Sequence, residues 1–317
     1  MKALHCIVPT FFELWSRRKG LLGATRPLVS LYVFLLTILS FSLYGNMPWV
    51  LATVTALCLG IVSASIQVFN DYRDRKHDTM KGKNFASQNA TPLFDFWLLI
   101  SSLAIVPLIH ILEINSKLGI FCIIIWGLGI LYSFLQKLFI VQNIIVALCA
   151  SLPAFCGHMH YGEPNFKDRS FFLFILLFAI IFVREVIKDI QDRKVDGGYK
   201  HTLPVMTAHH TKPEDIYKFR KPPLPFTIKI PIEELFPGFR PEIFPTFEVI
   251  SLVIGWSSLA CLGLGCAGVP TFFMMMGILL TFQFVLRNPD RFVLWAKNFI
   301  DATIIVLFAS LYIDNFF

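Results

Sequence analysis

Residues 170–196 read SFFLFILLFAIIFVREVIKDIQDRKVD, an apolar run that passes directly into a charged segment. The apolar part, at 170–187, is close to the length of about 20 residues that a helix needs to cross a bilayer. Apolar and polar residues do not alternate in it, so a membrane helix is favoured over a barrel strand. The stretch therefore predicts a transmembrane helix that ends in a cluster of acids and bases.

Eight further apolar runs of this kind occur along the chain, which brings the expected number of transmembrane helices to nine. Of the 317 residues, 56% are hydrophobic and only 15% are charged. This composition excludes a water-soluble globule, a disordered chain, a coiled coil and a disulfide-stapled secreted module. The fold class is therefore an all-α, polytopic membrane protein. The nine runs are 27–45, 48–69, 93–113, 118–135, 138–157, 170–187, 247–266, 269–286 and 299–316.

The basic residues predict how the chain is oriented in the membrane. If the N-terminus is cytoplasmic, all Lys and Arg except Lys117, Lys167 and Arg169 lie on the cytoplasmic side. Such an asymmetry is typical of cytoplasmic loops, so the net charge of +7 is assigned to membrane orientation and not to nucleic-acid binding.

Three parts of the chain are expected. Residues 1–26 form a cytosolic or interfacial amphipathic segment, and 27–317 form one membrane domain. A Pro-rich, basic cytosolic insert at about 205–246 interrupts this domain. It could cap the domain, lie on anionic lipid or bind a protein partner. On the outer side, His158 and His160 are expected to be exposed and not to bind metal.

Two charged segments carry the pattern DxxDxxxD. The first is part of NDYRDRKHD at 70–78, after the second run, and the other is DIQDRKVD at 189–196, after the sixth. The spacing i, i+3, i+7 places three carboxylates on one face of a helix, where like charges repel. Mg²⁺ prefers oxygen ligands and bridges carboxylates to phosphates. Paired acidic faces on the cytoplasmic side therefore predict Mg²⁺ and a diphosphate substrate.

The apolar spans predict that the rest of this substrate is apolar, as in a polyprenyl diphosphate. Loss of the diphosphate leaves a cationic allylic carbon, which aromatic faces stabilise. Aromatic residues make up 15% of the chain. Among the basic residues between the acids, Lys188 and Lys200 are expected to meet phosphate oxygens, and Arg73 is a further candidate.

These motifs resemble the two aspartate-rich motifs of the UbiA superfamily of intramembrane prenyltransferases. The resemblance covers nearly the whole chain and includes Arg26-Pro27 before the first run and Tyr132-Ser133 with Lys137. The stretch at 184–204 resembles the branch that contains digeranylgeranylglyceryl phosphate synthase. The resemblance implies helices around a central cavity with a cytosolic cap.

The resemblance also implies roles for individual residues. Asp71, Asp74, Asp189 and Asp192 would be catalytic. The Mg²⁺ ligands would be Asn70, Asp71, Asp74, Asp78, Asp189, Asp192 and Asp196. The residues near the diphosphate or the acceptor would be Arg26, Arg73, Tyr132, Lys137, Lys188 and Lys200.

The chain departs from the family pattern at two places that concern the acceptor. Leu28, Val29 and Ser30 occupy a region where members near this branch usually have Asn. Residues 81–89 replace a Pro-rich stretch that often follows the first motif.

The predicted activity is Mg²⁺-dependent transfer of a prenyl group to a lipid or aromatic acceptor within a membrane. A glyceryl phosphate lipid is favoured, and an aromatic ring such as a hydroxybenzoate is next. Two alternatives remain: an intramembrane terpene cyclase, which needs no acceptor, and a membrane transporter. Transporters place ionisable groups near the bilayer midplane, whereas these carboxylates follow the apolar runs.

Overall fold

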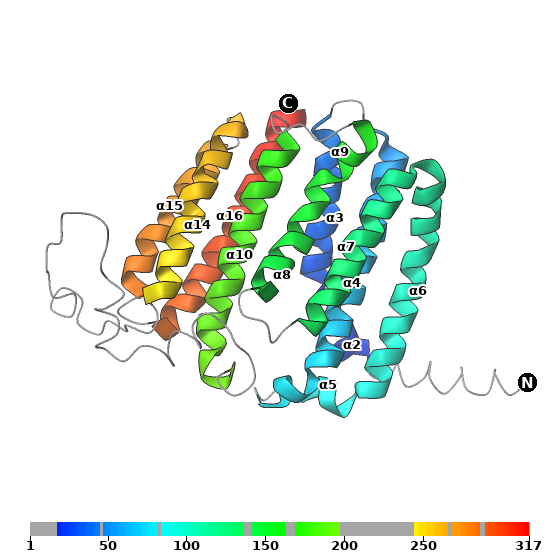
Figure 1. Cartoon of the computed structure of the whole chain (residues 1–317), viewed down its shortest axis with the longest axis horizontal. Coiled ribbons are helices and arrows are strands. Elements are labelled where there is room, and N and C mark those ends of the chain that lie inside the picture. The colour runs from blue at the N-terminus through cyan, green and yellow to red at the C-terminus, as the bar shows by residue number, and fades with distance from the viewer. Residues whose placement is uncertain are drawn as a thin grey trace, which may run out of the picture. The chain divides into compact units, whose positions relative to one another are not determined.

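The computed structural model describes residues 18–44, 47–80, 84–135, 141–162, 169–196, 244–265, 268–285 and 289–316. Within these ranges the chain is helical and contains no strand (Figure 1). Residues 1–17, Lys137, Lys200 and almost all of the insert at about 205–246 lie outside the described residues.

Within the described residues, a helix lies in every apolar run that the sequence predicts. The elements are α2 (Arg18–Ala24), α3 (Pro27–Ser42), α4 (Trp49–Met80), α5 (Phe85–Gln88), α6 (Ala90–Ile114), α7 (Ser116–Phe134), α8 (Val141–Ser151), η1 (Leu152–Phe155), α9 (Cys156–Tyr161), α10 (Arg169–Asp196), α14 (Phe244–Gly263), α15 (Gly268–Val285) and α16 (Pro289–Phe316).

Five helical stretches within the described ranges are long and apolar enough to cross a membrane. They are Trp49–Lys76, Ala90–Ile114, Ser116–Phe134, Val141–Tyr161 and Arg169–Asp189. Three shorter apolar helical stretches are Pro27–Ser42, Val249–Ser258 and Gly268–Gly277. An all-helical membrane protein is thus confirmed, whereas nine crossings, a central cavity and a cap stay predictions.

The helices differ from the predicted runs in two informative ways. Helices α4 and α10 do not end where the apolar runs end, because each continues through its acidic segment. The predicted run at 138–157 is not one α-helix, since α8 passes through the 3-10 turn η1 into α9. Pro153 lies in this turn and has no N–H to donate to the preceding helical turn.

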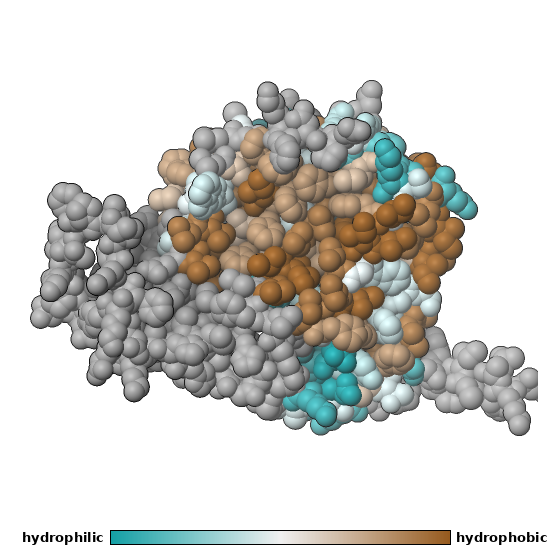
Figure 2. Space-filling view, in the orientation of Figure 1, coloured by the Kyte–Doolittle hydropathy of each residue, from teal (hydrophilic) through white to brown (hydrophobic). Residues whose placement is uncertain are grey.

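The chain divides into two compact units, and the first comprises Met1–Gln136 and Leu148–Phe174. In this unit α4 packs against α3, α6 and α7, and α9 packs against α3 and α7. Phe41, Leu59, Ile111, Leu118 and Cys156 belong to one core and are almost fully buried. Large apolar side chains of α6 and α7 remain exposed, and Figure 2 shows an apolar surface over these helices. Such a surface is suited to contact with lipid.

Glycine allows α9 to approach α3 closely. The Gly157 N–H donates to Ser40 Oγ at 3.1 Å. A Cβ atom at position 157 would collide with the Ser40 carbonyl group. The approach therefore depends on the absence of a side chain at this position.

The described end of the N-terminal segment is not a free tail. Leu21 and Ala24 of α2 are buried in a second core with Val68, Leu93 and Ile100. This core joins α2 to the C-terminal half of α4 and to the start of α6. A cytosolic or interfacial segment at 1–26 stays a prediction, and residues 1–17 lie outside the described residues.

The second unit comprises Lys137–Ala147 and Ile175–Phe317. Within it α15 packs against both α14 and α16. In this unit α10 is apolar at 175–183 and charged further on, and Leu176, Leu177, Val186 and Ile187 are almost fully buried. Burial of these side chains determines which face of α10 packs inside this unit.

Candidate functional site

The first acidic segment lies on the last turns of α4. Asn70 and Asp74 are buried, with 5% and 7% of their surface exposed. Asn70 Nδ2 donates to Asp74 Oδ2 at 3.4 Å, across one turn of the helix. Asp71 and Asp78 are half-buried. Because the segment is helical, Asp71, Asp74 and Asp78 lie near one face, as the spacing predicts.

Arg26 connects the start of α3 to this segment. Its Nη2 donates to Asp71 Oδ1 at 2.9 Å and forms a salt bridge. Arg26 precedes Pro27 with φ 45° and ψ 67°, and it is the one non-glycine residue with positive φ in the described ranges. Such a conformation is strained and persists where surrounding contacts hold it, often at functional sites. Arg26 was expected near the diphosphate or the acceptor, and the structure places it against Asp71.

Arg73 extends from the same segment toward α7. Its guanidinium carbon lies 4.5 Å from the centroid of the Phe134 ring, which is a cation–π distance. Phe134 ends α7, two residues after Tyr132, which is half-buried. The structure therefore brings Arg73 close to the end of the helix that carries Tyr132. Lys137 lies outside the described residues.

An aromatic group lies beside the first acidic segment, and individual positions in it were not identified from the sequence. The Phe69 ring centroid lies 4.8 Å from that of Trp97 and 5.9 Å from that of Phe134. The Phe94 centroid lies 5.3 Å from those of both Tyr72 and Trp97. Aromatic residues are so frequent in this chain that only packing could reveal this group.

The second acidic segment lies on the last turns of α10. Asp189 is 8% exposed, and its Oδ2 accepts from Asn143 Nδ2 of α8 at 2.8 Å. Asn143 is itself 3% exposed. Asn143 was missed, although an amide at the start of an apolar membrane helix is a signal that could have found it. The side chains of Asp192 and Asp196 lie outside the described part of the chain.

Lys188 is exposed and lies next to a buried acid. Its Nζ is 3.6 Å from Glu185 Oε2, one helical turn earlier. Glu185 Oε1 accepts from Arg184 Nη1 at 2.9 Å. Lys188 is thus held by an ion pair on α10.

The acidic residues suit Mg²⁺ by their chemistry. Asn70, Asp71, Asp74 and Asp78 in the first unit, and Asp189 in the second, offer oxygen donors of the kind that Mg²⁺ prefers. Among the residues whose side chains are described, no three His, Cys, Asp or Glu residues lie together as a metal-binding group. A complete ligand set therefore stays a prediction.

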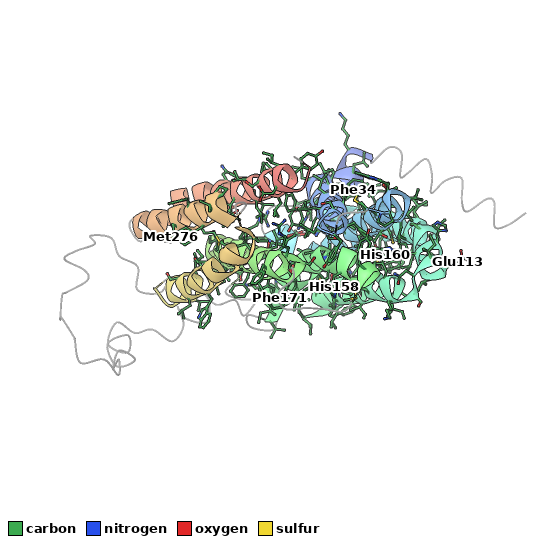
Figure 3. The ribbon with its side chains drawn as sticks, turned by 90° about the horizontal axis from the view of Figure 1, so that it is seen from above. Phe34, Glu113, His158, His160, Phe171 and Met276 are labelled. Atoms are coloured by element: carbon green, nitrogen blue, oxygen red, sulfur yellow. The ribbon has the colours of Figure 1, made fainter. Side chains whose placement is uncertain are left out.

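The histidine pair lies in the first unit at the end away from α2 and α5, on α9 (Figures 1 and 3). The expectation that His158 is exposed was wrong, since it is 2% exposed. Its Nδ1 is 3.0 Å from the Tyr44 hydroxyl, which is 2.8 Å from Ser170 Oγ. His160 Nδ1 lies 3.2 Å from Asn115 Nδ2. The two histidines therefore connect α9 to residues at the ends of other helices.

Comparisons with known proteins agree with this architecture. A family model described as the UbiA prenyltransferase family matches residues 30–213, more than half of the chain. No curated protein matches the chain. The fold is similar to a structure described as "Structural and mechanistic insights into the biosynthesis of Digeranylgeranylglyceryl phosphate synthase in membranes". The similarity has a TM-score of 0.62 and 15% identity, over 95% of this chain and 99% of that one.

A second similar structure is the apo form of a UbiA homolog from Aeropyrum pernix K1. Its TM-score is 0.57 at 8% identity, and the similarity covers 90% of this chain and 98% of that one. At these identities the two structures establish the fold alone.

Proposed function

Because the chain belongs to the UbiA prenyltransferase family, we propose that it transfers a prenyl group from a polyprenyl diphosphate to a lipid or aromatic acceptor, with Mg²⁺ as cofactor. The observation that carries this proposal is the continuation of two membrane helices, α4 and α10, into acidic segments. In each segment an aspartate accepts a hydrogen bond from another helix or its cap: Asp71 from Arg26 and Asp189 from Asn143. Membership of an enzyme family sets the transporter alternative aside.

The proposed binding residues lie in or near the two acidic segments. The proposed Mg²⁺ ligands are Asn70, Asp71, Asp74, Asp78, Asp189, Asp192 and Asp196. The groups proposed to meet the diphosphate or the acceptor are Arg26, Arg73, Tyr132, Lys137, Lys188 and Lys200. Bound Mg²⁺ would neutralise charge on the diphosphate and make it a better leaving group.

The protein's own residues orient the diphosphate and protect the prenyl carbon. The proposed arginine and lysine side chains would donate hydrogen bonds to the phosphate oxygens. The aromatic group around Phe69 offers ring faces beside the first acidic segment, where a cationic allylic carbon would be stabilised. The C–O bond to the diphosphate breaks as this carbon becomes cationic, and the acceptor then forms the new bond to it. The acceptor's proton passes to water or to the released diphosphate.

A glyceryl phosphate lipid is the favoured acceptor. Support comes from the stretch at 184–204, which resembles the digeranylgeranylglyceryl phosphate synthase branch. The similarity in fold to the synthase structure is compatible with this acceptor. An aromatic ring is the second choice. The N-terminus and both acidic segments are proposed to face the cytoplasm, with the insert at about 205–246 beside them as a cap, a lipid contact or a docking segment.

The test is product analysis with full-length protein in lipid nanodiscs. Labelled geranylgeranyl diphosphate and Mg²⁺ are offered with glyceryl phosphate lipids, with aromatic acceptors, or alone. We expect a prenylated glyceryl phosphate lipid and release of diphosphate, detected by mass spectrometry. A cyclic hydrocarbon formed without acceptor would establish the cyclase alternative instead, and a prenylated aromatic product would correct the acceptor.

A further inference from the structure

Asp301 is an ionisable residue on α16, within the ninth predicted transmembrane run. Its Oδ1 accepts from Arg184 Nε of α10 at 3.2 Å, within the second unit. Its side chain is 47% exposed, and an ionisable group in a predicted transmembrane run is a candidate for a functional contact. The acidic motifs do not include Asp301, and nothing in its local sequence pattern points to Arg184, 117 residues away.

The ion pair begins a series of contacts between charged side chains that continues along α10. This series, from Asp301 through Arg184 and Glu185 to Lys188, is called the relay below. Arg184 Nη1 donates to Glu185 Oε1 at 2.9 Å, and Glu185 Oε2 lies 3.6 Å from Lys188 Nζ. Lys188 immediately precedes Asp189. Asp301, Arg184, Glu185 and Lys188 together carry two negative and two positive charges, so the relay is neutral as a whole.

Asp301 and Glu185 together orient the guanidinium group of Arg184. The planar guanidinium uses Nε for Asp301 and Nη1 for Glu185, so two carboxylates fix its orientation. Glu185 is 7% exposed, and a buried carboxylate needs a cationic partner to remain ionised. Glu185 in turn contacts the ammonium group of Lys188, whose side chain is 46% exposed.

We propose that Asp301 is a positioning residue for diphosphate binding: through Arg184 and Glu185, it holds the Lys188 ammonium at the start of the second acidic segment of α10. This inference rests on the proposed function, because that function supplies the diphosphate that Lys188 would meet. In this role Asp301 touches no substrate and acts only through the other three residues.

The experiment measures diphosphate release from geranylgeranyl diphosphate by full-length protein in nanodiscs, with Mg²⁺ and a glyceryl phosphate lipid as acceptor. Asp301→Asn should raise KM about tenfold, with a smaller change in kcat, because a binding group is displaced. Asp301→Glu should restore most of the loss. The matched control is Asp314→Asn, the same change at an exposed position of α16, which should leave KM unchanged.

A double-mutant cycle separates the relay from a simple tie between α10 and α16. In a Lys188→Ala background, Asp301→Asn should have no further effect on KM, because residues that act through each other are not additive. The proposal would be overturned if the KM of the double variant rose by the product of the two single increases. It would also be overturned if Asp301→Asn left KM unchanged. If Asp301→Asn does not fold, Arg184→Lys serves instead, because Lys cannot contact both carboxylates in the same planar geometry.

Binding of inorganic pyrophosphate distinguishes failure of this inference from failure of the proposed function. Wild-type protein that releases no diphosphate would contradict the proposed function. The relay can still be tested by the rise in melting temperature on addition of pyrophosphate. Asp301→Asn and Lys188→Ala should reduce this rise equally. Unchanged stabilisation in either variant would overturn the relay.

Discussion

Asp71 and Asp189 begin the two DxxDxxxD motifs, and each accepts a hydrogen bond from outside its own helix. The donor is charged for Asp71 and neutral for Asp189. The Arg26–Asp71 pair is partly exposed, with 43% of the Arg26 side chain accessible, so it contributes little to stability. The contact is better explained as a way to orient a carboxylate.

Replacement of Asp71 or Asp189 by Ala should abolish Mg²⁺-dependent release of diphosphate, because each would lose a proposed metal ligand. The measurement is phosphate-coupled turnover by purified protein. The control is Glu113→Gln, at an exposed position of α6, which Figure 3 shows at the margin of the first unit. Normal turnover in either Asp variant would refute the metal assignment.

Replacement of Asn143 by Ala should remove a hydrogen bond to Asp189 while the aspartate itself stays in place. Asn143→Ala leaves a buried carboxylate without this donor, at a cost of about 1–3 kcal/mol. We expect a lower apparent affinity for Mg²⁺, measured as the Mg²⁺ concentration that gives half-maximal activity. Gln142→Ala, the neighbouring buried amide, is the control and should leave this concentration unchanged. Equal effects of the two variants would contradict a specific role for Asn143.

At the scale of elements, helix length and helix contact are decided by different residues. Helices α4 and α10 continue beyond their apolar runs. In each charged segment an acid precedes an arginine by four residues, Asp71 before Arg75 and Asp189 before Arg193, a spacing that favours helix. The contact between α3 and α9 depends instead on Gly157, whose N–H meets Ser40.

Gly157→Val should destabilise the contact between α3 and α9. The added side chain would collide with backbone atoms of Ser40, and overpacking of this kind costs about 1–3 kcal/mol. The measurement is the melting temperature of protein in detergent. Gly127→Ala provides the control, since a Cβ at that position of α7 meets open space. A melting temperature for Gly157→Val equal to that of the wild type would show that the backbones separate without cost.

At the scale of the molecule, the insert at about 205–246 is the part least like a membrane domain. It is basic and rich in Pro, and it carries none of the acidic motifs. Deletion of residues 206–240 should leave diphosphate release partly intact if the insert only caps the site or docks on lipid or protein. The measurement is diphosphate release per mole of folded protein. Complete loss of release from well-folded protein would assign the insert a direct part in the chemistry.

The sequence alone was sufficient for the features that depend on local order. Hydropathy over about 20 residues identifies a membrane helix, and the spacing of Asp71, Asp74 and Asp78 identifies one acidic face. The UbiA resemblance was confirmed by the family match over residues 30–213. These features come from residues within a few turns of each other.

Only the tertiary structure decided which side chains meet across helices. Arg26 reaches Asp71 over 45 positions, Asn143 reaches Asp189 over 46, and Arg184 reaches Asp301 over 117. No periodicity relates residues this far apart, because their contact depends on how neighbouring helices pack and rotate. The burial of His158 was missed for the same reason: three helix ends meet around it, and hydropathy carries no information about that meeting.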